Sequence, residues 1–227
     1  MRLLILGASG AGKGTQAQAI ASHFGIRHIS TGDFLREEIK PNTALCRAVK
    51  RLIDRGDLVP DELMLSIVHE ILEGNDFILD GFPRTFAQAL ALDEICDRLG
   101  SPIDMALNIH VPDDDIIQRI TGRKVCPNCK AMFHIIFYPP KQAFTCDHCG
   151  GRLEQRPDDT ASTVRHRLKI YHERTLPIID FYDRQGLLIS TSGTGDVDEI
   201  TKNLIDLLEA KLLVAKLEKK MEKGLWR

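Results

Sequence analysis

The sequence predicts an α/β fold: a doubly wound, parallel, five-stranded sheet that carries a phosphate-binding loop, with a helical flap and a small β insertion added to it. Three observations predict this class. Short apolar runs alternate with longer helical patterns, the runs are continuously apolar, and a glycine-rich loop separates the first run from the first helical pattern. Continuous apolar runs are typical of parallel strands that helices cover on both faces.

The expected elements follow one another in β-α order. Strands are expected at 3–6, 77–80, 105–111 and 187–191, with 26–30 as a weaker fifth, and helices at 15–23, 61–72, 86–99 and 161–185. This alternation is that of a doubly wound fold.

Two segments interrupt the alternation. Residues 30–59 are helical in pattern and add no clear strand, so we expect a flap there. Residues 122–159 hold four cysteines, short β-like runs and a Pro-Pro pair, which indicates a small β insertion. The core domain is then expected at 1–29, 60–121 and 160–208, and a basic helical extension at 209–227.

Composition and charge narrow the class of protein. The chain has 227 residues, a formal net charge of −2 and a pI near 6.4, so it has no general attraction for nucleic acid. Six cysteines without a signal peptide argue against a disulfide framework, and the first apolar run is too short to span a membrane. We therefore expect a cytoplasmic protein without nucleic-acid or membrane partners.

The segment GASGAGKGT, residues 7–15, has the spacing of a phosphate-binding loop, with Gly12 and Lys13 in the signature places. Glycines let backbone N–H groups turn toward phosphate oxygens, and the following helix N-terminus adds positive charge. Gly14 directly follows the lysine, and the first residue with a hydroxyl group after it is Thr15. This order weakens a GTPase or motor-ATPase interpretation, in which the hydroxyl next to the lysine holds magnesium.

Four of the cysteines form two matched pairs. Cys126, Cys129, Cys146 and Cys149 have the spacing Cys-x2-Cys-x16-Cys-x2-Cys, which is a strong tetrahedral zinc signature. Four thiolates close the coordination shell of the metal. One structural Zn²⁺ per chain is therefore expected.

The last 17 residues, KLLVAKLEKKMEKGLWR, carry six Lys or Arg against two Glu. One interpretation is a helix that binds a membrane surface or a partner protein. The other, which we favour, is a last helix that packs on the body and exposes a solvated basic face.

Several short motifs occur together with the loop: STGDFLR at 30–36, GDLVP at 56–60, LDGFPRT at 79–85, and Gln88. With GKGTQ and the paired arginines that flank the cysteines, this set resembles the long-lid bacterial adenylate kinases that have a four-cysteine zinc lid. The resemblance runs from residue 1 to about 208 and leaves the basic tail outside it.

The resemblance implies phosphoryl transfer from MgATP to AMP, giving two ADP, by a monomer with a monophosphate-binding flap at 30–59 and a zinc lid at 122–159. It implies an ATP site of Gly10, Ala11, Gly12, Lys13, Gly14, Thr15, Arg119, Arg123, Met132, Phe133 and Gly195. It implies an AMP site of Thr31, Arg36, Asp57, Leu58, Val59, Gly81, Phe82, Pro83, Arg84, Gln88, Arg156 and Arg167.

The resemblance also implies roles. Lys13, Arg36, Arg84, Arg123, Arg156 and Arg167 would be catalytic, and Asp33 and Asp80 would hold Mg²⁺ through water. A loose phosphoryl-transfer transition state needs charge neutralisation and alignment, so no nucleophile is assigned. Phe133 and Phe137 are expected in the lid core, with the backbone around Met132 and Phe133 touching ATP. The chain departs from the family at Ser9, where many relatives have proline, and at Gly195, which replaces a side chain.

Two alternatives stay open. A kinase for another monophosphate, such as UMP or CMP, would share the loop, although Gln88 and Thr31 favour AMP. A zinc-ribbon protein that binds nucleic acid would need a basic, aromatic ribbon. Residues 126–151 contain Lys130 and Lys141 as their only lysines, which disfavours the ribbon interpretation.

Overall fold

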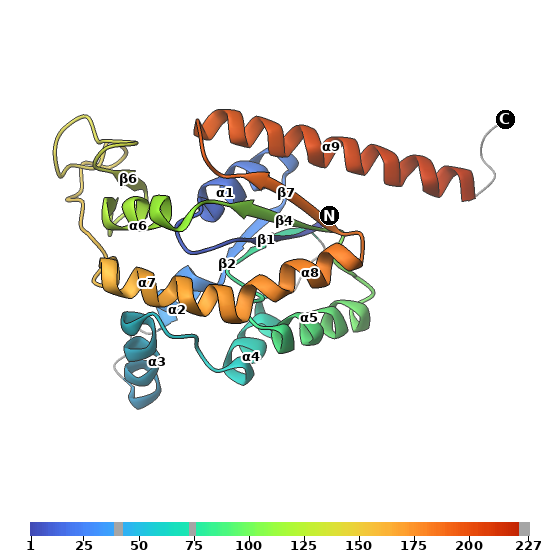
Figure 1. The fold of residues 1–227 in the computed structure, drawn as a ribbon, viewed down its shortest axis with the longest axis horizontal. Helices are drawn as coiled ribbons and strands as arrows, with labels where there is room; N and C mark the ends of the chain where they lie inside the picture. Colours follow the sequence, from blue (N-terminus) through green and yellow to red (C-terminus); the bar gives the residue numbers. More distant parts are fainter. Residues whose placement is uncertain (39–42, 73–75, 223–227) are drawn as a thin grey trace.

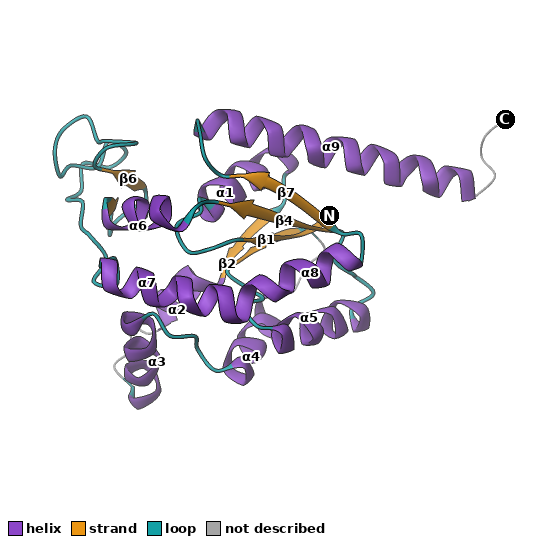
Figure 2. Cartoon of the chain, viewed as in Figure 1, coloured by secondary structure: helices purple, strands orange, loops and turns teal. Residues whose placement is uncertain are grey.

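The computed structural model describes residues 1–38, 43–72 and 76–222. Within these residues a five-stranded parallel sheet has the order β2-β3-β1-β4-β7 (Figure 1, Figure 2). Its strands are β1 (Arg2–Leu6), β2 (Arg27–Ser30), β3 (Phe77–Asp80), β4 (Met105–His110) and β7 (Leu188–Ser192). The predicted fold class is confirmed, and the weaker fifth strand is a full member of the sheet at its edge.

Both faces of the sheet are buried, and β1 explains why its sequence is continuously apolar. Leu3 and Ile5 pack into a core on one face, while Leu4 and Leu6 pack into a second core on the other. All four are at most 3% exposed. Side chains alternate across a strand, so a strand with helices on both faces must be apolar at every position.

The helices form two layers around the sheet (Figure 2). The first core joins β1 to α1 (Lys13–Phe24), α6 (Asp113–Thr121), α7 (Ala161–Ile170) and α9 (Val197–Glu222). The second core joins it to α4 (Asp61–Ile71), α5 (Phe86–Arg98) and α8 (Leu176–Arg184).

The helix predicted at 161–185 is interrupted. Between α7 and α8 the backbone widens into a π-helical turn at Tyr171–Thr175. Pro177 lies at the start of α8 and has no N–H to donate, so a regular α-helical ladder cannot continue through it. The hydroxyl of Thr175, inside the turn, donates to the backbone O of Arg84 at 2.8 Å. The widened turn thus links this helix to the loop after β3.

The flap predicted at 30–59 contains α2 (Thr31–Glu38) and α3 (Ala44–Arg55), and residues 39–42 lie outside the described part. Thr43 begins α3 by accepting a hydrogen bond from the backbone N of Cys46 at 3.1 Å. Leu35 and Val49 bury their side chains in the core that β1 shares with α4 and α5. The flap is therefore helical where it is described, and it is anchored to the second core.

The predicted β insertion contains a two-stranded antiparallel sheet of β5 (Arg123–Val125) and β6 (Met132–His134). Its core is small: Phe133 and Leu153 pack with two of the four clustered cysteines, Cys126 and Cys146. The expectation that Phe133 is a core residue is confirmed, since its side chain is 2% exposed. The same expectation for Phe137 is wrong: its side chain is 58% exposed, because the small core of the insertion is already filled by Phe133 and Leu153.

The last helix, α9, packs on α1 through Leu204 and Leu208, and then continues past the body to Glu222 (Figure 1). The interpretation that it packs on the body therefore holds only for its first half. Residues 223–227 of the predicted extension lie outside the described part. Among the described helices, none is both long and apolar enough to cross a membrane.

Candidate active site

The glycine-rich loop turns sharply between β1 and α1. Gly7, Gly10 and Gly12 have φ values of +136°, +89° and +93°, a region that residues with a side chain rarely adopt. A Cβ on Gly7 would lie 2.5 Å from the backbone O of Ile109, so the loop passes directly over the end of β4. The glycine spacing is thus required by backbone conformation and by close approach.

Lys13 begins α1 and turns back over the loop. Its Nζ donates to the backbone O of Ala8 at 2.9 Å, so the ammonium lies inside the turn where phosphate oxygens would be cradled. Burial, together with the positive charges of Arg84 and Arg123, lowers the pKa of Lys13 to about 8, although Asp80 acts to raise it. The negative charge of an anion bound in the loop would act to raise this pKa.

Asp80 ends β3 and faces this lysine. Burial acts to raise the pKa of Asp80, but His28 and the positive charges of Lys13 and Arg84 hold the pKa below its ordinary value. Asp80 pairs in register with Ser30 of β2, and the hydroxyl of Ser30 donates to Asp33 Oδ2 at 3.0 Å. The two carboxylates predicted to hold magnesium-bound water therefore lie at neighbouring strand ends, which fits the preference of Mg²⁺ for oxygen ligands.

The loop after β3 holds Arg84 against the backbone. Gly81 has φ +86°, and a Cβ there would lie 2.8 Å from Thr31 Oγ1 and 3.2 Å from Arg84 Nη2. Arg84 Nε donates to the backbone O of Gly81 at 2.7 Å. Burial lowers the pKa of Arg84, and the positive charges of Arg167 and Arg36 also lower it, although Asp80 acts to raise it. Phe82, between these residues, is 1% exposed and is packed into the second core.

Gln88 has both ends of its amide engaged. Its Oε1 accepts from the backbone N of Arg84 at 2.7 Å, and its Nε2 donates to Asp61 Oδ1 at 2.6 Å. A carboxamide has two donors and two lone pairs on oxygen, so each end keeps one further hydrogen bond. Gln88 is 2% exposed, and the space around it is narrow in this conformation.

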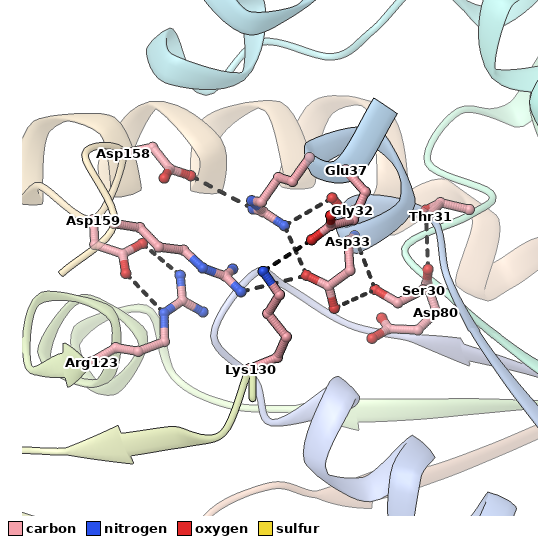
Figure 3. Close-up of polar contacts among 12 residues, drawn as sticks. Ser30, Thr31, Gly32, Asp33, Glu37, Asp80, Arg123, Lys130, Asp158 and Asp159 are labelled. Carbon is pink, nitrogen blue, oxygen red and sulfur yellow. Dashed lines mark hydrogen bonds and ion pairs between the residues drawn. The ribbon is translucent and has the colours of Figure 1, made fainter. Parts of the chain in front are cut away.

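Four further arginines carry carboxylate partners, and Figure 3 labels one of these pairs, Arg123 with Asp159. Arg123 forms a bidentate ion pair with Asp159: its Nε donates to Oδ2 at 2.9 Å and its Nη2 donates to Oδ1 at 2.5 Å. Arg167 bonds Asp158 through Nη2 and donates to a flap carbonyl, the O of Ile53, at 3.2 Å. These are the charge-assisted, planar contacts that a guanidinium also makes with phosphate.

Arg36 and Arg156 lie on opposite sides of the gap between flap and lid, and each pairs with Asp33. The distances are 3.3 Å from Arg36 Nη1 and 3.5 Å from Arg156 Nη2 to the same Oδ1. Arg36 Nη2 is also 3.8 Å from Asp158 Oδ2. Burial, together with the positive charges of Arg36 and Arg123, lowers the pKa of Arg156 to about 10, although Asp33 and Asp159 act to raise it.

A second contact joins the lid to the flap. Lys130 Nζ lies 3.0 Å from Glu37 Oε1 on α2, although the two residues are far apart in sequence (Figure 3). Lys130 has φ +65°, a left-handed backbone that is uncommon for a residue with a side chain. The cavity below, lined by Lys13, Arg84 and Arg167 among others, measures about 40 Å³. That space holds a few waters at most.

The other predicted site residues are distributed around this centre. Met132 lies over the loop, since a Cβ on Gly14 would be 3.9 Å from Met132 Cε. Arg119 is half-buried in the last turn of α6, and Gly195 (φ +121°) follows β7. The remaining members, Ala11, Thr15, Asp57, Leu58, Val59 and Pro83, lie in the loop, at the end of the flap and after β3; the carboxylate of Asp57 accepts from His166 Nε2 at 2.8 Å.

The four clustered cysteines can hold a metal ion. Their Sγ atoms all lie within 4.8 Å of one another, with Cys126–Cys149 at 3.4 Å and Cys129–Cys146 at 3.5 Å. A tetrahedral zinc–thiolate centre places its sulfurs about 3.8 Å apart, since each Zn–S bond is about 2.3 Å. Backbone N–H groups of Cys129 and Asn128 lower the pKa of the Cys126 thiol to about 6. At Cys129 and Cys149 the backbone N–H groups of Ala131 and Gly151 act to lower the pKa, but burial and neighbouring cysteines raise it. The positive charge of a metal ion would stabilise the thiolates that it requires. Geometry and donor chemistry both fit zinc.

Sequence reasoning missed the carboxylates that hold the site together. Asp158 and Asp159 are 4% and 1% exposed and pair with Arg167 and Arg123, and Asp61 holds Gln88. The signal was present, because two adjacent acids directly after Arg156-Pro157 are unusual in a site that must bind anions. Their partners could not be chosen without the fold.

Metal removal gives the first prediction. Because the insertion has a small core, loss of zinc by chelation or by Cys129→Ser should lower the melting temperature and increase amide exchange at 122–159. All four thiols should resist alkylation until the metal is removed, and metal analysis should find close to one zinc per chain. Cys46→Ser, outside the cluster, is the matched control. A melting temperature unchanged after complete demetallation would contradict a stabilising role.

The second prediction concerns the Lys130–Glu37 pair. Lys130→Gly should relieve the left-handed backbone, stabilising the lid by about 1 kcal/mol, while it removes the contact with the flap. An exposed pair contributes up to about 1 kcal/mol, so amides of α2 should exchange roughly two- to fivefold faster. Phe144→Gly is the control, because Phe144 has φ +62° and is 66% exposed in the same insertion. Equal effects of the two variants on α2 would contradict a link between lid and flap.

Comparison with known proteins identifies the family. The family model described as adenylate kinase matches residues 5–187. An adenylate kinase of Caldicellulosiruptor bescii is 50% identical over 212 residues, covering 92% of this chain and 99% of that protein. An adenylate kinase of Thermodesulfovibrio yellowstonii is 48% identical over 215 residues, covering 93% of this chain and 100% of that protein. An adenylate kinase of Bacillus licheniformis is 47% identical over 212 residues, covering 92% of this chain and 98% of that protein. The chain belongs to the adenylate kinase family.

Proposed function

We propose that this chain carries out the reaction of its family, the reversible transfer of a phosphoryl group between ATP and AMP to give two ADP. The observation that carries the proposal is the meeting of a phosphate loop with one lysine and five arginines at the carboxyl edge of a parallel sheet. Ligands of open α/β sheets bind at this edge. Family membership supplies the identity of the two nucleotides.

On the donor side, the backbone amides of Gly10 to Thr15 and the ammonium of Lys13 bind the ATP phosphates. Arg119 and Met132 lie over the base and sugar, with the backbone near Gly195 at the base edge. The position of Met132 above Gly14 supports this assignment. Zinc keeps the lid folded and takes no part in the transfer, because four thiolates leave the metal no open position.

On the acceptor side, Arg36 and Arg84 bind the AMP phosphate, and Thr31, the backbone of Asp57 to Val59, and Gln88 contact the nucleoside. Gln88 keeps one donor and one acceptor after its bonds to Asp61 and Arg84, which suits an adenine edge. Mg²⁺, when bound through water by Asp33 and Asp80, supplies positive charge to the ATP phosphates. The oxygen-rich strand ends at these two residues support that assignment.

The transfer step depends on charge and alignment. Arg123, Arg156 and Arg167 exchange their carboxylate partners for phosphate oxygens when both nucleotides are bound, so the cations are already aimed at the site before substrate arrives. The attacking AMP phosphate oxygen and the leaving ADP oxygen lie in line, and the arginines and Lys13 neutralise the charge on the transferred group. No protein nucleophile is needed.

The division into a core, a flap at 30–59 and a lid at 122–159 follows from the same proposal, since flap and lid exclude water from the reaction by closing together. The chain is proposed to act as a monomer in the cytoplasm. Of the six cysteines, none is in a disulfide and four are clustered as metal ligands, which supports a reducing compartment.

The function is tested by ADP formation with AMP, GMP, CMP and UMP compared as acceptors. AMP should be preferred, and a preference for UMP or CMP would support the related kinase instead. Lys13→Met and Arg84→Ala should each lower kcat by about 10²- to 10³-fold, the usual cost of removing a preorganised charge donor. Lys169→Met and Arg98→Ala, which change the same residue types at exposed sites, should keep activity. Activity within a few-fold of the parent would remove that residue from the mechanism.

The lowered pKa of Lys13 predicts how ATP binding depends on pH. With a pKa of about 8 the unliganded lysine is largely neutral at pH 9, while bound phosphates favour the charged ammonium. ATP binding should therefore take up close to one proton at pH 9 and almost none at pH 7, and affinity should fall by up to about tenfold per pH unit above 8. Calorimetry in buffers of different ionisation enthalpy measures the uptake. Lys13→Met should show none, and equal uptake by that variant would refute the assignment.

A further inference from the structure

The second half of α9 is not part of the body. Ile200, Leu204 and Leu208 are buried at a spacing of four, and Leu212 is the last residue that packs against this core. From residue 213 to 222 the helix projects into solvent (Figure 1). Ten helical residues span about 15 Å. A projecting helix without a packing partner is marginal in water, so an apolar face on it needs an explanation.

The projecting half carries such a face. Leu213, Val214, Leu217 and Met221 are 58%, 51%, 37% and 67% exposed. They recur every three or four residues, which places them on one side of the helix. Val214 lies about 200° around the axis from Leu212, because each residue turns an α-helix by about 100°. This apolar stripe therefore faces away from the face that packs on the body.

The comparisons do not extend over the whole chain. The family model ends at residue 187, before α9 begins. The Caldicellulosiruptor bescii relative is matched over 99% of its own length while 8% of this chain stays unmatched. Figure 1 places the projecting end of α9 at the far side of the molecule from β6 of the lid. An object bound there would leave flap and lid able to move.

Charge decides between the possible occupants. Residues 211–227 carry net +4, whereas the whole chain carries −2, so the remainder carries −6. A second copy pairing along the same stripe would bring a like-charged helix, which electrostatic repulsion disfavours. An anionic surface is attracted instead, and one that also accepts apolar side chains is a lipid bilayer with acidic headgroups.

We propose that α9 beyond Leu212 is a membrane-surface helix that binds anionic lipid. The stripe of Leu213, Val214, Leu217 and Met221 lies at the headgroup boundary, and the net charge of +4 over residues 211–227 attracts this end of the chain to the acidic headgroups. The stripe is short, so binding needs both contributions and is reversible and sensitive to salt. This departs from the expectation, drawn from the sequence, that the chain has no membrane partner. It is independent of the phosphoryl-transfer proposal.

The test uses the full, zinc-loaded chain and vesicles of phosphatidylcholine alone or with about 30% phosphatidylglycerol. At low salt the chain should sediment with the anionic vesicles at least about tenfold more strongly than with neutral ones, and 0.5 M NaCl should abolish the difference. The double variant Leu213→Ser with Leu217→Ser should bind about tenfold more weakly. Far-ultraviolet circular dichroism verifies that the helix persists in the variant.

The control is Leu90→Ser with Leu99→Ser, two exposed leucines at α5 on the body, which should bind as the parent does. ADP formation without vesicles should be unchanged in both double variants. Failure of the parent chain to bind anionic vesicles at low salt would overturn the proposal, as would equal losses in the two double variants. A dimer in sedimentation equilibrium that Leu213→Ser with Leu217→Ser abolishes would also overturn it and assign the stripe to a second copy.

Discussion

One lysine and five arginines gather at the carboxyl edge of the sheet, and the constraint on the whole structure is that these like charges must stay together without a bound phosphate. Carboxylates make this possible: Asp159 holds Arg123 and Asp158 holds Arg167, both from buried positions. A buried cation without a partner is strongly destabilising. Even so, burial and its cationic neighbours lower the pKa of Lys13, which indicates that the cluster is incompletely neutralised and ready for an anion.

The segments that supply these charges also have to move. Asp33 and Glu37 of the flap pair with Arg156 and Lys130 from the lid side, and these rim contacts are at least partly exposed. Exposed ion pairs contribute little, so they bias closure without locking it. The buried ion pairs therefore stabilise the site, while the partly exposed pairs at the rim leave it free to open.

The lid and the end of α9 are both additions to the core domain with little apolar packing of their own. The lid has only a small apolar core around Phe133 and Leu153, and the zinc proposed at its four clustered cysteines would compensate by cross-linking two turns. The end of α9 has apolar residues but no core to join, so its exposed leucines are available to another surface. In both cases the sequence pattern becomes understandable once the extent of apolar packing is known.

The sequence by itself determined the features that depend on neighbouring residues. Continuous apolar runs are required of strands covered on both faces, the glycines of residues 7–12 are required by positive φ, and paired cysteines are required by a metal. Only the tertiary structure decided contacts between distant segments: Asp158 with Arg167, the engagement of Gln88 by Asp61, the link from Lys130 to Glu37. It also decided that α9 leaves the body after Leu212. The reason is physical, because local spacing constrains backbone conformation, whereas the choice of a charge partner or a packing surface depends on which segments the folded chain brings together.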